Sequence, residues 1–345
     1  MLYKSTNRLL KALVYFYFIS LCGACLSQKD KAGTFLCLSD SYNREIKLDK
    51  EPEKIISLSP GITEMLFLLN AEDKLIGISD YCDYPEETQY IRKVGGLQNI
   101  NIENIISLQP DVVLIGSIIP KNEVDKLEKS GITVIAIKQE EKLEGMLDAL
   151  KMLGQIVNNE RCADSLGLYY RNLLEEYRTC VTRYTLQALH VTNNTESKRC
   201  LKPQTSNLTP HTSHLTPHTA HLTPHTSHRK PTVYYAVSFG AAGDFTAPAN
   251  SHINEIIEYA GGRNIGENLT TWNISREYLF TQNPDIIFIR TEDLPYFVKT
   301  YPYTLLDAVK EGRVYPIESG WIDVISPRNF WAIEVMKENI HFLKH

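Results

Sequence analysis

The sequence lacks the features that mark several large protein classes. Only one continuous apolar run occurs among its 345 residues, at the extreme N-terminus, so a polytopic membrane protein is excluded. The net charge of −5 argues against a nucleic-acid binder, which is usually basic. Glycine and proline are too few for a collagen-like chain, whereas a hydrophobic content of 43% is ample for packed cores. We therefore expect a folded protein, long enough for two domains.

Motifs that carry catalysis are also missing. The chain has no Gly-x-Ser-x-Gly, no Walker loop and no His-Glu-x-x-His, and no histidine precedes His190. Acidic residues are plentiful, but no nucleophile or acid–base pair stands in a defined context. We expect that the protein is not an enzyme and carries no cofactor; an α/β enzyme is the alternative.

Cysteines are few and irregularly placed. The long spacing of the seven matches neither a disulfide framework nor a zinc ribbon. The one Cys-x-x-Cys pair, Cys22 and Cys25, lies inside the N-terminal apolar segment. The cysteines therefore indicate neither a disulfide-stabilised fold nor a metal site.

The N-terminus has the pattern of an export signal. Three cations precede a short apolar run at 12–21, and no acid appears before Asp30. The run ends in Leu21–Cys25, which resembles the bacterial lipobox with Cys25 as the lipidated residue. We expect residues 1–25 to be a lipoprotein signal peptide and 26–52 a tether and first segment, which places the protein in the periplasm or cell envelope, anchored to a membrane by lipid. The alternative is an ordinary cleaved signal.

Strand and helix signals alternate along the rest of the chain. Short Ile- and Val-rich runs, such as 55–58 and 111–115, are separated by helical segments, which predicts parallel βαβ units. Residues 141–184 have helical periodicity without proline, which predicts one long helix; Asn158 and Asn159 are where a kink or a break can occur. The predicted fold is α/β, with an N-terminal lobe at 53–140 and a C-terminal lobe at 233–345.

An internal repeat relates the two lobes. Glu103 stands seven residues before Pro110-Asp111 and an apolar strand, and Glu277 stands seven residues before Pro284-Asp285 and another. Each segment predicts a helix, a Pro-Asp turn and a buried strand. We therefore expect two similar lobes joined by a long rigid helix, with a ligand cleft between them. The alternative is that Pro-Asp before a strand is only common turn chemistry.

Residues 185–232 have a different composition. Three copies of a Leu-Thr-Pro-His-Thr-(Ser/Ala)-His unit occupy 208–228, and the proline in each copy excludes a coiled coil. The polar composition predicts disorder. One interpretation is a metal-collecting arm, because imidazoles bind zinc, copper and nickel. The other is a duplication tolerated in a surface loop. The weak candidate metal ligands are His211, His214, His218, His221, His225 and His228.

Six short motifs lie in the two lobes: Lys54–Glu64, Ser79–Pro85, Val94–Glu103, Tyr259–Ile265, Ser275–Glu277 and Ser326–Arg328. As a set they resemble the periplasmic binding proteins that carry cobalamin or ferric siderophores, and the second motif is most similar to the cobalamin branch. The resemblance implies two Rossmann-like lobes bridged by a rigid helix. It also implies capture of a small molecule for an ABC importer, with the permease and ATPase subunits as partners and a monomeric, non-catalytic carrier.

The resemblance also assigns roles to residues. Glu103 and Glu277 match one glutamate per lobe that pairs with arginines of a two-fold permease; the alternative is solvated glutamates favoured at helix starts. Two tryptophans and a tyrosine suit a large flat ligand such as a corrinoid, although core packing is the ordinary role of a tryptophan. The implied ligand-lining residues are Ser59, Pro60, Gly61, Tyr81, Leu97, Trp272 and Trp321.

Departures from the family pattern leave the ligand open. Leu97 and Gly116 stand where tryptophans are expected, and Gly320 and Val324 replace polar contacts. Cobalamin or another corrinoid is the leading expectation, and a ferric siderophore or haem is the alternative within the same class. A zinc carrier would need histidines on both sides of the cleft, and the first lobe has none.

Overall fold

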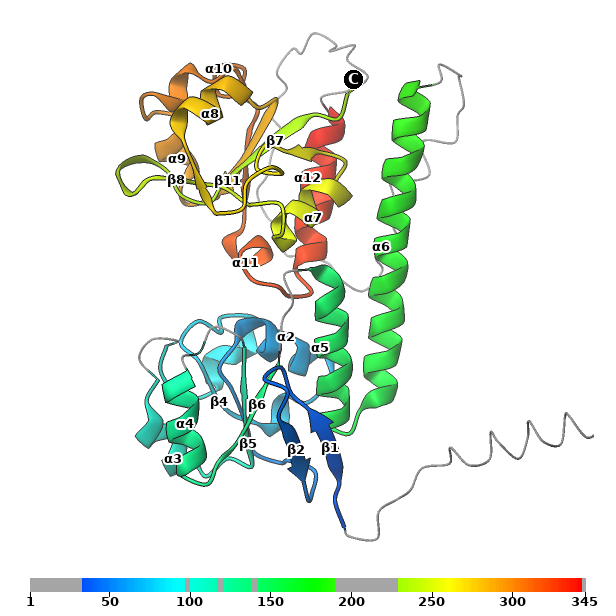
Figure 1. Cartoon of the computed structure of the whole chain (residues 1–345), viewed down its shortest axis with the longest axis vertical. Coiled ribbons are helices and arrows are strands. Elements are labelled where there is room, and N and C mark those ends of the chain that lie inside the picture. The colour runs from blue at the N-terminus through cyan, green and yellow to red at the C-terminus, as the bar shows by residue number, and fades with distance from the viewer. Residues whose placement is uncertain are drawn as a thin grey trace, which may run out of the picture.

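The computed structural model describes residues 33–96, 100–116, 119, 121–137, 142–189 and 229–342, with backbone alone at 183–189 and at 342. The predicted signal peptide with Cys25, the six histidines of the repeat and Leu97 lie outside these residues. The chain forms two lobes, one above the other in Figure 1, with a long helix running beside both. No helix of the described part combines the length and apolar character needed to cross a membrane.

The N-lobe is built on a four-stranded parallel sheet in the order β4-β3-β5-β6. A separate antiparallel ribbon of β1 (Leu36–Ser39) and β2 (Glu45–Leu48) precedes it. The strands and helices of the lobe are β3 (Ile55–Ser57), α2 (Pro60–Leu68), η2 (Glu72–Lys74), β4 (Leu75–Ile78), η3 (Glu86–Tyr90), α3 (Ile102–Leu108), β5 (Val112–Ile115), α4 (Lys121–Lys129) and β6 (Thr133–Ala136).

The C-lobe has a second parallel sheet in the order β12-β11-β7-β9, with a short antiparallel pair of β8 and β10 beside it. Its elements are β7 (Thr232–Ala236), η5 (Gly240–Ala242), β8 (Asp244–Phe245), α7 (His252–Tyr259), β9 (Arg263–Asn264), β10 (Asn273–Ile274), α8 (Arg276–Gln282), β11 (Ile286–Arg290), α9 (Leu294–Phe297), η6 (Tyr303–Leu305), α10 (Asp307–Lys310), β12 (Val314–Ile317), α11 (Ser319–Ile322) and α12 (Asn329–Phe342).

The two sheets share one topology, which confirms that the repeat is structural. In each lobe the strands lie in the order second, first, third, fourth. The two aspartates of the repeat also make equivalent hydrogen bonds. Asp111 Oδ2 accepts from the backbone N–H of Lys54 at 2.9 Å, just before β3, and Asp285 Oδ2 accepts from the N–H of Thr232 at 2.7 Å, where β7 begins. Each Pro-Asp turn therefore ties its own strand to the neighbouring one.

The predicted single helix over 141–184 is wrong in one respect. The segment forms two helices, α5 (Leu143–Ile156) and α6 (Glu160–Leu189), which run side by side, and only α6 spans both lobes (Figure 1). Asn158 adopts the left-handed conformation with φ of 59°, and Asn159 Nδ2 donates to the Leu69 carbonyl. A Cβ on Gly154 would overlap Ala163, so the close approach of the two helices requires glycine there.

One apolar core joins the lobes. Its buried residues include Leu66 of α2, Leu150 of α5, Leu174 of α6, Ile256 of α7 and Ile333 of α12. Smaller clusters cover the opposite face of each sheet, because successive strand side chains point to alternate faces. The shared core fixes the lobes against α5 and α6.

Candidate functional site

The carboxyl ends of the two sheets face one another. In the N-lobe, β3 ends at Ser57 and leads through Ser59 into α2; in the C-lobe, β12 ends at Ile317 and leads into α11. A residue of α2 binds a residue that follows α11, as described next, so the two strand ends meet between the lobes (Figure 1). Ligands of open α/β sheets bind outside the carboxyl ends of the strands, which makes this face the candidate site.

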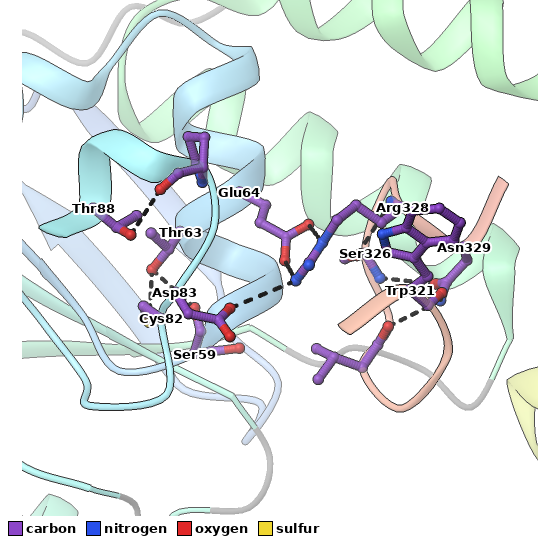
Figure 2. Close-up of polar contacts among 12 residues, drawn as sticks. Ser59, Thr63, Glu64, Cys82, Asp83, Thr88, Trp321, Ser326, Arg328 and Asn329 are labelled. Atoms are coloured by element: carbon purple, nitrogen blue, oxygen red, sulfur yellow. Dashed lines mark hydrogen bonds and ion pairs between the residues drawn. The ribbon is translucent and has the colours of Figure 1, made fainter. Parts of the chain in front are cut away.

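A buried ion pair bridges the lobes at this face. Glu64 of α2 accepts two hydrogen bonds from Arg328, from Nε at 3.0 Å and from Nη2 at 2.5 Å (Figure 2). Only 4% of the Glu64 side chain and 9% of the Arg328 side chain are exposed. The two residues are 264 positions apart in the sequence, so the pair forms only when both lobes are in place.

The surroundings of Arg328 hold its guanidinium in one position. Its backbone N–H donates to Ser326 Oγ at 3.2 Å, and its charge lies 4.6 Å from the centre of the Tyr84 ring, a cation–π contact. A Cβ on Gly320 would overlap Nη1, so this glycine leaves the space that the arginine occupies. Gly320, which the sequence presented as a lost polar contact, is therefore part of the bridge.

Burial sets the protonation energetics of the bridge. Desolvation raises the pKa of the Glu64 carboxyl, and the hydrogen bonds and charge of Arg328 act in the opposite direction. Burial likewise raises the pKa of Tyr84, which lies against Arg328. The arginine therefore offsets only part of the desolvation, and the pKa of Glu64 stays above its ordinary value.

Aromatic rings continue the bridge across the interface. Tyr84 of the N-lobe meets Trp331 of α12 edge-on, with ring centres 5.8 Å apart, and Trp331 meets Trp321 edge-on at 5.5 Å. Trp331 was missed at the level of sequence. Its position three residues after Arg328 in the Ser-Pro-Arg motif is the signal that could have found it. Trp321 is thus partly engaged by another ring rather than standing alone.

The predicted Ser-Pro-Gly segment forms the start of α2. Ser59 is the N-cap residue with extended backbone, and Pro60 stands in the first turn, where a missing N–H costs nothing. Thr63 Oγ1 binds the Ser59 carbonyl at 3.0 Å and Cys82 Sγ at 3.2 Å, as drawn in Figure 2. Through Thr63 and Cys82, the structure brings this turn close to the loop that carries Tyr81.

Tyr81 and Trp272 are exposed aromatics on opposite lobes. Tyr81 is 58% exposed, and its Cε2 would lie 3.1 Å from a Cβ on Gly96. Trp272 is 40% exposed and precedes β10; its carbonyl accepts from Thr246 N–H at 2.8 Å. The ring contacts of the described residues connect neither side chain to Trp321. The structure thus brings only part of the predicted lining set together.

A paired arginine also ends a central strand of the C-lobe. Arg290, the last residue of β11, forms an ion pair with Asp323 at 2.7 Å, and Tyr235 donates to the same carboxylate at 2.7 Å. The Arg290 and Asp323 side chains are partly exposed. The Arg290 guanidinium and the Tyr235 hydroxyl, both donors, therefore lie beside the Asp323 carboxylate, an acceptor, just after α11.

The two repeat glutamates occupy matching positions. Glu103 and Glu277 are the second residues of α3 and α8, helices of seven residues each, and both side chains are exposed. Each helix is capped by the residue before it, Asn101 or Ser275. Within the described ranges, neither glutamate carboxylate forms an ion pair with the protein.

No group of three or more His, Cys, Asp or Glu side chains in the described part of the chain is arranged to hold a metal ion. His252, one of the few histidines there, is buried, and its Nε2 lies 2.7 Å from the Ile322 carbonyl. Burial lowers the pKa of His252, which favours the neutral ring. The His252 ring therefore binds the last residue of α11.

Comparisons connect this geometry to known proteins. Residues 55–184 match the family described as "Periplasmic binding protein". An uncharacterized ABC transporter substrate-binding lipoprotein of Bacillus subtilis is 25% identical over 332 residues, which cover 93% of this chain and 92% of the relative. A vitamin B12-binding protein of Vibrio vulnificus is 25% identical over 293 residues, which cover 83% of this chain and 89% of the relative.

Solved structures give the same fold. A periplasmic vitamin B12 binding protein of Vibrio cholerae superposes with a TM-score of 0.62 at 21% identity, covering 85% of this chain and 98% of its own. A periplasmic heme binding protein of Pseudomonas aeruginosa gives 0.66 at 18% identity, covering 84% and 92%. The predicted resemblance to the periplasmic binding proteins and the two-lobed α/β fold are thereby confirmed. The family consists of substrate-binding proteins of transporters, not enzymes.

Proposed function

We propose that this relative of the periplasmic binding proteins captures cobalamin or a related corrinoid between its lobes and delivers it to an ABC permease. The observation that carries the proposal is the neutralised, aromatic character of the face between the lobes. Arg328 is paired with Glu64, Arg290 with Asp323, and rings of Tyr84, Trp331 and Trp321 lie beside them.

The chemistry of the candidate ligands separates them. A corrinoid is a large flat ring bordered by neutral amides, which need both donors and acceptors and stack on aromatic planes. Haem and ferric siderophores bear anionic groups, which are best held by cations that are not already neutralised. Arg290 and Asp323 offer donors and acceptors without net charge. The vitamin B12-binding relative of Vibrio vulnificus supports the same choice.

Docking to the permease is assigned to Glu103 and Glu277. Their equivalent places in two repeated lobes suit a partner with two-fold symmetry. Arginines on that partner would pair with the carboxylates bidentately and fix the orientation of the complex. The solvated alternative predicts that removing both charges leaves transport unchanged.

The location follows from the N-terminus. Cys25, outside the described residues, is the proposed lipidation site, and the lipoprotein relative of Bacillus subtilis supports it. Two acyl chains hold a protein on a membrane firmly, whereas one chain binds marginally. The working form is a monomer in the cell envelope, without a resident cofactor, beside the permease and ATPase subunits.

Calorimetric titration with cyanocobalamin, haem and a ferric siderophore tests the ligand. We expect one cyanocobalamin per chain. Trp321→Ala should weaken binding by about three- to tenfold, because an aromatic contact contributes about 0.5–1.5 kcal/mol beyond its area. Tyr296→Ala removes an exposed aromatic of α9 and is the matched control, with unchanged affinity. Tight binding of haem or the siderophore with no cyanocobalamin heat would replace the corrinoid assignment.

Charge reversal tests the docking role. Glu103→Lys with Glu277→Lys should abolish uptake in cells and leave ligand affinity intact, since like charges across an interface cost several kcal/mol. Glu72→Lys with Glu176→Lys makes the same change of net charge at exposed sites elsewhere and should transport normally. Normal uptake by the first double variant, or loss of its ligand affinity, would refute the docking assignment.

A further inference from the structure

The helix that carries Glu277 is fastened at its first residue. Arg276 Nε donates to Asp244 Oδ2 at 2.8 Å, and Arg276 Nη2 donates to the Gly240 carbonyl at 2.6 Å. Glu277 follows directly, and the N–H of the next residue, Tyr278, donates to the capping hydroxyl of Ser275 at 3.1 Å. The backbone of Glu277 is therefore held on both sides.

The anchor of Arg276 is rooted in the core of the C-lobe. Only 3% of the Asp244 side chain is exposed, and its Oδ1 accepts from the Tyr303 hydroxyl. Tyr303 is fully buried and stacks on Phe297, with ring centres 4.8 Å apart. Gly240 N–H donates to the Tyr303 hydroxyl at 2.9 Å, which closes the network. Arg276 thus ties an exposed helix start to packed aromatic side chains.

The same network reaches the ligand side of the lobe. Asp244 lies in β8, which pairs with β10, the two residues between Trp272 and the cap of α8. Trp272 therefore lies five residues before Glu277, along a segment that is paired on one side and anchored by Arg276 on the other.

The N-lobe counterpart is fastened differently. Ile102 stands at the position of Arg276, and the helix is held by Arg92, which donates to Asn104 Oδ1 at the protein surface. No ion pair with a buried carboxylate secures α3 within the described residues. The pseudo-symmetric helices thus differ in how firmly their glutamates are placed.

We propose that Arg276 is a positioning residue for docking: it orients Glu277 toward a basic group of the permease and keeps that carboxylate unpaired by directing its own charge into Asp244. The inference rests on the proposed docking role of Glu277 and deepens it. A helix start whose backbone is ordered before association loses less freedom on binding, so the complex gains affinity from the anchor. The C-lobe glutamate is then the preorganised member of the pair.

Uptake of radiolabelled cyanocobalamin tests this in cells that express full-length variants in place of the native protein. Arg276→Met should lower uptake about tenfold, with ligand affinity of the purified protein unchanged within about twofold. Arg276→Lys, which keeps a cation near Asp244, should restore most uptake. Arg263→Met is the matched control, because Arg263 forms an ion pair at 2.7 Å with Glu267, a residue outside the helices. This variant should transport normally.

A double-mutant comparison separates positioning from general damage. If Arg276 acts through Glu277, then Arg276→Met should cost nothing further in a Glu277→Gln background. Hydrogen exchange of residues 272–283 should also rise in Arg276→Met and stay at the native level in Arg276→Lys. Equal losses in both backgrounds, or native uptake and native exchange in Arg276→Met, would overturn the inference. Normal uptake by Glu277→Gln would overturn the docking role itself, and the anchor's function with it.

Discussion

The bridge between the lobes gives a direct test of the structure. Replacing Arg328 with methionine leaves Glu64 buried, with 4% of its side chain exposed and without its bidentate cation. Removing one partner of a buried ion pair costs about 3–5 kcal/mol, because the remaining charge cannot return to water. We expect a loss of this size in the free energy of unfolding, measured by urea denaturation.

The pH dependence of Arg328→Met follows from the same contacts. Burial already raises the pKa of Glu64, and Arg328 opposes that rise, so removing the arginine raises the pKa further. A carboxyl with a raised folded-state pKa favours folding at low pH and disfavours it once the pH exceeds its unfolded pKa, about 4.3. The variant should therefore lose stability relative to the native protein as the pH rises from about 4.

Two further variants make the test decisive. Glu64→Leu combined with Arg328→Met removes both charges and should recover most of the stability, because a hydrophobic pair of similar volume is often as stable as the ion pair. Arg178→Met breaks an exposed pair with Glu144 and should cost less than about 1 kcal/mol. A loss for Arg328→Met no larger than that of Arg178→Met would refute the buried bridge.

Two other predictions concern single residues of the C-lobe and α6. Gly320→Ala places a methyl against Arg328 Nη1 and should destabilise the protein by about 1–3 kcal/mol in thermal unfolding. Gly167→Ala, in α6 with open space around it, should instead stabilise the protein by about 0.5–1 kcal/mol. Equal effects of the two substitutions would contradict the packing of Arg328. His252, whose pKa is lowered by burial, resists protonation when folded, so stability should fall as the pH drops below about 6.5. His252→Gln should flatten that fall, and an unchanged slope in this variant would refute the assignment.

Local signals in the sequence were sufficient for much of the fold. The Glu-to-Pro-Asp repeat predicted α3 and α8, the turns after them and the strands that follow, because caps and turns depend on neighbouring residues. Gln109 and Asn283 both adopt the left-handed conformation before the proline, as such a turn requires. The exposed positions of Glu103 and Glu277 could be inferred from the same pattern.

Other features depended on packing that no local pattern carries. Helical periodicity over 141–184 could not show whether Asn158 and Asn159 kink a helix or reverse the chain, because both outcomes keep the same apolar spacing. The reversal is decided by the fit of α5 against α6, where Gly154 meets Ala163. The helix that links the lobes therefore begins at Glu160.

The site separates most clearly what the sequence predicted from what tertiary packing decided. The sequence determined the two parallel sheets, and with them the strand ends where Ser59, Tyr81 and Trp321 lie, because apolar runs and turn residues specify the alternation of strands and helices through local propensity and burial. Only the tertiary structure decided that Glu64 pairs with Arg328 and that Trp331 completes the aromatic contact between the lobes. A charge can remain buried only where a distant partner and its hydrogen bonds meet it, and that meeting depends on how the two lobes pack against α5 and α6.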